Sequence, residues 1–239
     1  MQKVIAVVTT LLLAGFSAIA GASEATVKAE MQKKYPDIQV ESVTKTPLAG
    51  IYEVFAGGQL IYADEKAAYL FVNGNLIDTD KKLNLTEERM NQLTAMKFEQ
   101  LPLSLAFKKV KGKGTRKLAY FGDPNCGYCK RFEQGLTKIE DVTIYVFLYP
   151  VLGPDSLQKS KSIWCSKDRA KAWDDQLING VAPTAAGSCD TPIEKILAFG
   201  KQKNITGTPT LFFADGVRIP GAIPVEQVEQ RLAAATQSK

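Results

Sequence analysis

The residues best suited to chemistry are two cysteines separated by two positions, in the stretch Cys126-Gly127-Tyr128-Cys129. An apolar and aromatic run at 117–121 precedes them and predicts a buried strand, and helical spacing follows from 130 to 139. The first sulfur is therefore expected at a helix N-terminus, where unpaired backbone N–H groups and the helix dipole stabilise an anion. A thiolate there attacks disulfides, and the second cysteine, one helical turn away, can close the bond. The spacing predicts dithiol–disulfide exchange.

The first 22 residues have the pattern of a secretory signal peptide. Lys3 gives a positive start, residues 4–20 are apolar, and Ala20-Gly21-Ala22 is a small-x-small site for cleavage before Ser23. The alternative is a retained membrane anchor, since the apolar run approaches spanning length. We favour cleavage because no stop-transfer pattern follows, and we expect a soluble mature protein in an oxidising compartment.

Composition excludes several kinds of site. The chain of 239 residues has no histidine, which excludes c-type haem attachment, histidine-containing zinc sites and Ser-His or Cys-His catalysis. The formal net charge of +5 comes from one short stretch, because residues 101–117 hold six basic residues and no acidic ones. A short basic run interrupted by glycines, at 108–117, predicts a solvated linker rather than a nucleic-acid or lipid patch.

The four cysteines can pair in three ways. Because Cys126 and Cys129 are adjacent on one helix face, Cys165 and Cys189 are left to each other. A zinc site made of all four cysteines is possible on count alone, but the second pair lacks the short spacing that such sites show. We expect no metal and no cofactor.

Residues 23–84 predict a small α+β domain built on an antiparallel sheet. A helix at 23–35 is followed by short strands with turn residues between them, at 38–46, 51–55, 60–62, 68–72 and 76–79. A core this small is marginal alone, so we expect a two-fold dimer through sheet edges. Residues 85–116 are expected to form a linker helix, capped by Thr86, and the basic linker.

Residues 117–239 predict an α/β domain. After the first strand and the redox helix, a strand at 142–148 is expected parallel to the first because a helix separates them. The remaining elements are a helical region at 154–179, a helix at 192–203, a strand at 208–213, a hairpin strand at 217–219 and a helix at 225–234. This is the element order of a thioredoxin fold with a helical insertion.

Several segments together resemble the DsbC and DsbG family of periplasmic disulfide isomerases, over essentially the whole mature chain. They are Cys126-Gly127-Tyr128-Cys129, Ile163-Trp164-Cys165-Ser166-Lys167-Asp168-Arg169 with Ala172-Trp173-Asp174-Asp175, Ser188-Cys189-Asp190, and Gly207-Thr208-Pro209. The resemblance implies a V-shaped homodimer joined through the N-terminal domains, with a cleft that binds misfolded proteins. It also implies that a membrane reductase of the DsbD type keeps the active pair reduced.

Carried over by position, the resemblance assigns each site residue a role. Cys126 is the attacking thiolate and Cys129 the resolving thiol, Pro209 is a cis-proline preceded by Thr208, and Cys165 and Cys189 form a structural disulfide. Gly127 and Tyr128 tune the site. Lys130, after the second cysteine, departs from the family pattern; a cation there favours the thiolate.

Other candidates have a structural interpretation. Asp123 and Lys130 are expected to be turn and surface residues rather than proton shuttles, and Trp164 and Trp173 to be core residues. The favoured function is a periplasmic disulfide isomerase and reductase with chaperone character. The alternatives are a net disulfide oxidase, a client-specific thiol reductase, and a holdase chaperone whose thiols do not matter.

Overall fold

The computed structural model describes residues 23–237, so the predicted signal peptide at 1–22 lies outside the described residues. The described chain divides into two compact units, the first comprising residues 23–56 and 61–73 and the second residues 57–60 and 74–237. Among residues 23–237, no helix combines the length and the apolar composition needed to cross a bilayer.

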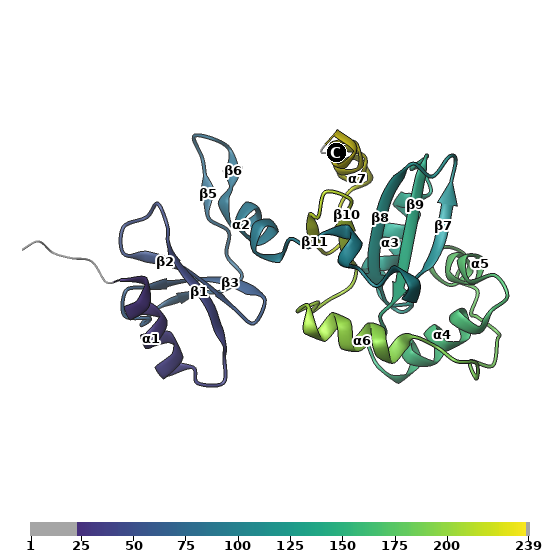
Figure 1. The fold of residues 1–239 in the computed structure, drawn as a ribbon, viewed down its shortest axis with the longest axis horizontal. Helices are drawn as coiled ribbons and strands as arrows, with labels where there is room; N and C mark the ends of the chain where they lie inside the picture. The colour runs from purple at the N-terminus through teal and green to yellow at the C-terminus, as the bar shows by residue number, and fades with distance from the viewer. Residues whose placement is uncertain (1–22, 238–239) are drawn as a thin grey trace, which may run out of the picture. The chain divides into compact units, whose positions relative to one another are not determined.

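The first unit is a helix packed on a four-stranded antiparallel sheet, as the sequence predicted (Figure 1). Ser23 begins the helix by accepting a hydrogen bond from the Thr26 N–H, and Val27 and Met31 on one face of the helix are wholly buried. These two residues pack against the inward-facing side chains of the strands. The elements are α1 Glu24–Lys34, β1 Val40–Lys45, β2 Ile51–Ala56, β3 Gln59–Asp64 and β4 Leu70–Phe71, with sheet order β1-β2-β3-β4.

A short hairpin, β5 Ile77–Asp78 and β6 Leu83–Asn84, leads into helix α2, Leu85–Thr94. The side chain of Asn84 caps this helix by accepting from the Glu87 N–H at 3.1 Å. The prediction that Thr86 is the cap was wrong, because its buried hydroxyl accepts the Leu76 N–H at 2.7 Å instead.

The second unit contains a five-stranded mixed sheet in the order β11-β10-β8-β9-β7. Strands β8 and β9 are parallel, as predicted, and the other neighbours are antiparallel. The strands are β7 Phe107–Lys111, β8 Arg116–Gly122, β9 Val142–Leu148, β10 Thr210–Phe213 and β11 Arg218–Pro220. Two 3₁₀ turns, η1 Phe98–Gln100 and η2 Leu103–Leu105, precede β7.

The stretch that we predicted as a solvated basic linker is instead an edge strand over part of its length, because β7 pairs with β9. Its side chains alternate, with Phe107 buried and Lys108 and Val110 exposed. Lys109 points inward with only 11% of its side chain exposed, since two carboxylates receive its ammonium group. The alternation was hidden because Lys109 and Lys111 occupy two of the inward positions.

Both faces of this sheet are covered. Leu118 and Tyr120 of β8 face a core formed with helices α3 Gly127–Leu136 and α7 Val225–Gln237. Ala119 and Phe121 face the opposite core, which includes Ile196 of helix α6 Ile193–Gln202. The alternation of β8 therefore fixes which residues lie under the redox helix.

The predicted helical insertion is confirmed, but it is three elements rather than one: α4 Pro154–Cys165, α5 Arg169–Asp174 and a π-helical turn η3 Asp175–Asn179. Helix α4 ends at Cys165 with Ser166 as its C-cap, and Asp168 starts α5 by accepting the Lys171 N–H at 2.9 Å. Trp173 is wholly buried and Trp164 is 9% exposed, which confirms both as core residues.

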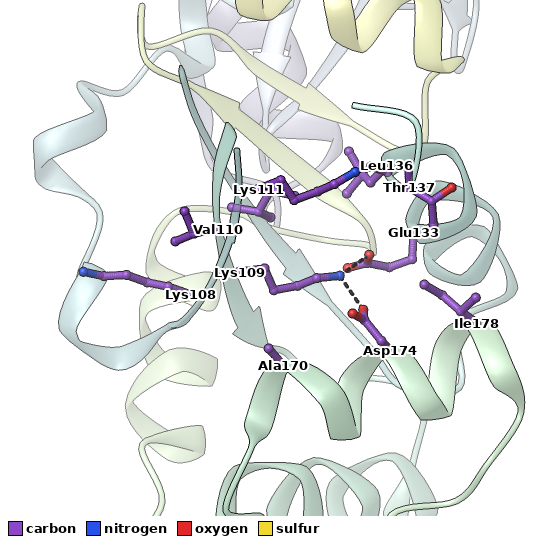
Figure 2. A pocket seen from close by; sticks show the side chains of 11 residues that line it. Lys108, Lys109, Val110, Lys111, Glu133, Leu136, Thr137, Ala170, Asp174 and Ile178 are labelled. Atoms are coloured by element: carbon purple, nitrogen blue, oxygen red, sulfur yellow. Dashed lines mark hydrogen bonds and ion pairs between the residues drawn. The ribbon is translucent and has the colours of Figure 1, made fainter. Parts of the chain in front are cut away.

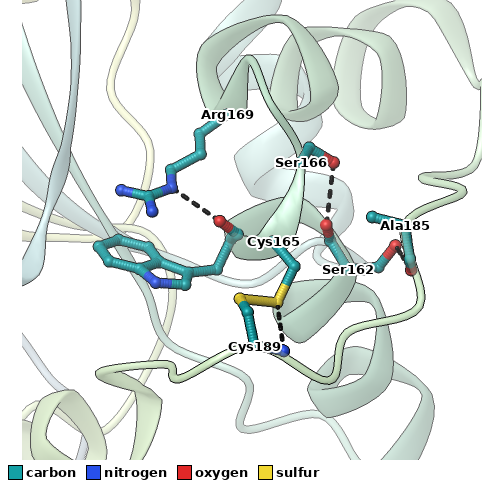
Figure 3. Close-up of a disulfide and its surroundings, with 7 residues drawn as sticks. Ser162, Cys165, Ser166, Arg169, Ala185 and Cys189 are labelled. Carbon is teal, nitrogen blue, oxygen red and sulfur yellow. Dashed lines mark hydrogen bonds between the residues drawn. A yellow bond between two sulfur atoms is a disulfide. The ribbon is translucent and has the colours of Figure 1, made fainter.

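A disulfide joins Cys165, the last residue of α4, to Cys189 in the loop before α6 (Figure 3). Closing a loop with a sequence separation of 24 stabilises the fold by about 3 kcal/mol in the chain-entropy model. The Cys189 N–H also donates to the Cys165 sulfur at 3.2 Å. The Arg169 guanidinium lies 3.8 Å from the Trp164 ring centroid and donates to the Trp164 carbonyl, so the same corner is held by polar contacts.

Candidate active site

Two free cysteines, Cys126 and Cys129, lie where strand β8 leads into helix α3. Strand β8 ends at Gly122, and the Cys126 N–H closes the intervening turn by donating to the Asp123 carbonyl at 3.1 Å. Cys126 is the N-cap residue of α3 and Cys129 lies within its first turn. The Cys126 side chain is nearly buried, with 6% of the residue exposed, and Cys129 is wholly buried.

The two thiols have opposite protonation preferences. The hydrogen bond from Cys129 is the main cause that lowers the pKa of Cys126 from 9.0 to about 5, helped by the Thr208 side chain and by the N–H groups of Cys129 and Tyr128, and opposed by burial. The Cys129 N–H points at the Cys126 sulfur from 3.4 Å. The hydrogen bond with Cys126 and burial raise the pKa of Cys129. At neutral pH the pair therefore holds one thiolate, on the outer sulfur, and one thiol.

Thr208 and Pro209 lie beside the outer sulfur, although 82 positions separate Thr208 from Cys126 in the sequence. The Thr208 carbonyl oxygen is 3.2 Å from the Cys126 sulfur and accepts a hydrogen bond from the thiol when Cys126 is protonated. The Thr208-Pro209 peptide bond is cis. Strand β10 begins at the next residue, Thr210, which is opposite Phe121 near the end of β8.

Two side chains that sequence reasoning missed support the segment before Thr208. Arg218, 8% exposed, donates to the carbonyls of Lys203 at 2.8 Å and Asn204 at 2.6 Å. The Tyr149 hydroxyl donates to the Ile205 carbonyl at 2.9 Å. These bonds fix the backbone that leads into the residue facing Cys126.

Asp123 is wholly buried, so the turn part of its prediction is right and the surface part is wrong. One carboxylate oxygen accepts the Asn125 N–H at 2.8 Å and the Ser156 hydroxyl at 2.7 Å. The other oxygen accepts the N–H groups of Val151 at 2.8 Å and Leu152 at 3.0 Å. A single carboxylate thus joins the cysteine loop to the loop that follows β9, which no local sequence pattern indicates.

Asn125, the residue before Cys126, extends this network to helix α4. Its side-chain amide donates to Asp155 at 2.7 Å and to Ser156 at 3.0 Å, and its oxygen accepts from the Lys159 ammonium at 2.8 Å. The cysteine loop is therefore held both by Asp123 and by polar side chains of α4.

The other predicted site residues are on the surface. Tyr128 is 60% exposed, as expected, and its ring centroid lies 4.5 Å from the Arg131 guanidinium. Lys130 is exposed, which confirms its surface prediction. No heavy atom lies within 4 Å of where a Cβ at Gly127 would be, so space does not require a glycine there.

A buried polar cluster lies under the redox helix and was also missed by sequence reasoning (Figure 2). Glu133, one turn after Cys129, is wholly buried and accepts from Lys109 at 2.6 Å, from the Trp173 indole at 2.7 Å and from the Tyr120 hydroxyl. Lys109 also pairs with Asp174. Burial, followed by the Glu133 charge, raises the pKa of Tyr120, so this hydroxyl stays protonated and keeps donating.

In the part of the chain that the structure describes, no group of three cysteine, histidine or carboxylate side chains is arranged to hold a metal ion. The two thiols and the hydrogen bonds around them suit dithiol–disulfide exchange.

Comparisons with known proteins agree with this geometry. A family model described as a thioredoxin-like domain matches residues 103–236, and one described as the N-terminal domain of a disulfide bond isomerase protein matches residues 18–87. The probable thiol:disulfide interchange protein DsbC of Bordetella pertussis is 43% identical over 206 residues, which cover 86% of this chain and 73% of that protein. The Escherichia coli K12 DsbC is 28% identical over 229 residues, 92% of each chain.

A solved structure is similar as well. The crystal structure of a disulfide interchange protein from Neisseria gonorrhoeae superposes with a TM-score of 0.54 at 39% identity, covering 56% of this chain and 98% of that one. The fold, the thiol pair and these similarities together show that the chain belongs to the DsbC family of thiol:disulfide interchange proteins.

Proposed function

We propose that this protein is a homodimeric disulfide isomerase and reductase of the periplasm that rearranges incorrect disulfides in exported proteins and has chaperone character. The observation that carries the proposal is the asymmetry of the thiol pair: Cys126 is ionised at neutral pH and keeps a small exposed area, whereas Cys129 is wholly buried and protonated. An isomerase needs a thiol that is ionised at neutral pH and that also leaves readily. A low pKa provides both the thiolate and the good leaving group, and these offset the lower intrinsic nucleophilicity of such a thiolate.

Isomerisation conserves electrons. The Cys126 thiolate attacks one sulfur of a wrong client disulfide, forms a mixed disulfide and releases the other client sulfur as a thiolate. A client thiolate then attacks the client sulfur of the mixed disulfide. The new client disulfide forms, and the electron pair of the broken bond returns to Cys126, which leaves as a thiolate. The enzyme ends the cycle in the reduced state in which it began.

Reduction is the second outcome. If no client thiolate attacks, Cys129 loses its proton and attacks the Cys126 sulfur, which releases the client as a thiol and leaves a Cys126–Cys129 disulfide. The client gains two electrons and the enzyme loses them, so a dithiol reductant must restore the pair. A membrane reductase of the DsbD type supplies this role in the proposal.

The remaining predicted residues have supporting roles. Thr208 and Pro209 present backbone beside the Cys126 sulfur, where an extended client segment can pair with it. Gly127 and Tyr128 shape the exposed approach to the sulfur. Cys165 and Cys189 stabilise the fold and take no part in exchange.

Dimerisation and location rest on separate observations. The first unit matches an isomerase N-terminal domain, and its small sheet ends in edge strands β1 and β4, which are candidates for pairing with a second copy. A periplasmic location is supported by the signal pattern at 1–22 and by the disulfide between Cys165 and Cys189.

Reactivation of scrambled ribonuclease tests the proposal directly. The full-length protein should restore ribonuclease activity, and Cys126→Ser should lose nearly all of this while still suppressing aggregation of an unfolded protein. Unchanged reactivation by Cys126→Ser would show a holdase whose thiols do not matter. If the oxidised protein oxidises reduced ribonuclease but the reduced protein leaves scrambled ribonuclease inactive, the protein is a net oxidase instead.

A further inference from the structure

The loop between β9 and α4 exposes two aliphatic side chains on a rigidly held backbone. Val151 is 42% exposed and Leu152 is 58% exposed. Their N–H groups donate to the same oxygen of Asp123, at 2.8 Å and 3.0 Å, and this carboxylate is wholly buried. The backbone that carries them is therefore fixed by charge-assisted hydrogen bonds.

This loop lies next to the nucleophile. Strands β8 and β9 are parallel and end together, with Gly122 opposite Leu148, and the Tyr149 N–H donates to the Gly122 carbonyl at 2.8 Å. The other oxygen of Asp123 accepts the N–H of Asn125, the residue before Cys126. One carboxylate thus joins the backbone of the aliphatic pair to the backbone that leads into the reactive sulfur.

Exposing aliphatic side chains to water is unfavourable in free energy, so a mobile loop would bury them against the protein. Here the buried carboxylate prevents this and keeps both side chains at the surface. A fixed apolar surface costs little further ordering when a ligand covers it, so it is suited to binding. The polypeptide attached to Cys126 during exchange is the ligand that this position favours, because Asp123 joins this loop to the residue before the reactive sulfur.

We propose that Val151 and Leu152 form a docking subsite for an apolar side chain next to the client cysteine that reacts with Cys126. The inference rests on the proposed function and adds a preference to it: extended, unfolded segments with aliphatic or aromatic residues beside the cysteine react faster than segments with polar neighbours. Such cysteines are buried in a correctly folded client, so the subsite favours misfolded chains.

The test uses two peptides, each with one cysteine bonded to thionitrobenzoate, flanked by leucines in one and by serines in the other. In full-length protein carrying Cys129→Ala, the Cys126 thiolate takes the peptide sulfur and releases coloured thionitrobenzoate, so the rate is read directly. The docking variant is Val151→Thr with Leu152→Asn, which keeps both N–H groups for Asp123. The matched control is Val110→Thr: Val110 is 61% exposed on β7 and lies opposite Thr143, at the end of β9 away from the site.

The docking variant should react about three- to tenfold more slowly with the leucine peptide, as expected for losing part of an apolar contact. Its rates with the serine peptide and with dithionitrobenzoate, which has no flanking residues, should stay within about twofold of the parent, as should every rate of the Val110→Thr control. Equal loss on both peptides, no loss on either, or equal loss in the control would overturn the subsite. Failure of the parent to react with any of the three probes faster than an ordinary thiol would instead overturn the proposed function.

Discussion

At the scale of single residues, the site depends on two side chains, the reactive thiolate of Cys126 and the buried carboxylate of Asp123. Cys126 is reactive because its neighbours donate hydrogen bonds to the thiolate, and Asp123 fixes the loop that leads into Cys126 and the loop that carries the proposed client surface. Asp123 itself touches no reacting atom. It is a positioning residue, and its burial means that its contribution can be measured as stability.

Asp123→Asn should therefore destabilise the protein, with the Cys165–Cys189 disulfide intact, by about 2 kcal/mol, because an amide nitrogen cannot accept and at least one of the buried donors loses its partner. Urea denaturation measures this. Asp190→Asn, which removes the same charge from an exposed position, is the control and should change stability by less than about 0.5 kcal/mol. Equal, small effects would show that the Asp123 bonds do not hold the loops.

At this scale, the sequence predicted the features that depend on neighbouring residues and missed those that depend on residues far apart in the chain. Cys126, Cys129 and the strand and helix around them follow a local pattern, and that pattern was sufficient. Asp123 looked like a turn residue because Gly122 and Pro124 flank it, whereas the donors that bury it come from residues 151–156, beyond the next strand. No single-chain pattern reports such a contact.

At the scale of elements, the redox helix is fixed to the sheet edge by charge. Glu133 of α3, Lys109 of β7 and Asp174 of α5 meet under the helix, as Figure 2 shows. Burial lowers the pKa of Lys109, but the two carboxylates outweigh it and the pKa is raised, so the lysine stays charged. Strand β7 thus anchors the helix that carries both cysteines.

Lys109→Met should destabilise the protein by about 3 kcal/mol or more, since it leaves the buried Glu133 carboxylate without its cation. Lys108→Met is the matched control: the neighbouring lysine points outward, and its loss should cost less than about 0.5 kcal/mol. Thermal or urea unfolding of the two variants decides the matter. A stable Lys109→Met protein would mean that Glu133 is satisfied by Tyr120 and Trp173 alone.

Element boundaries show the same limit of sequence reasoning. Strands β8 and β9 were predicted closely because both are continuous apolar runs, which is typical of a buried parallel pair. Strand β7 was missed because two of its inward positions are lysines: Lys109 finds its partners on α3 and α5, and Lys111 donates to two carbonyls at the end of α3. A lysine in a sequence predicts a solvent-exposed position. The carboxylates that let Lys109 point inward, Glu133 and Asp174, come close to it only in the folded chain.

At the scale of the whole molecule, the two units divide the proposed function. The second unit holds the thiols and their supporting contacts, and the first matches an isomerase N-terminal domain and holds no cysteine in its described residues. The proposal therefore requires the first unit to form the dimer interface, so that each dimer contains two catalytic units.

Light scattering of the full-length mature protein should give the mass of a dimer, and a variant lacking residues 23–80 should be a monomer. That variant should still reduce dithionitrobenzoate through Cys126. It should reactivate scrambled ribonuclease poorly, because a single catalytic unit binds an unfolded client more weakly than two linked units do. A monomeric full-length protein, or a deletion variant that isomerises as well as the parent, would contradict the role of the first unit.

The most direct test of the central claim is the rate of iodoacetamide alkylation of Cys126 as a function of pH, in reduced full-length protein with the modified residue identified by mass spectrometry. Only the thiolate reacts, so the rate should be constant at neutral pH and fall as the pH drops through a midpoint of about 5. A rate that is low at pH 7 and rises only toward a midpoint near 9.0, the ordinary thiol value, would contradict the account.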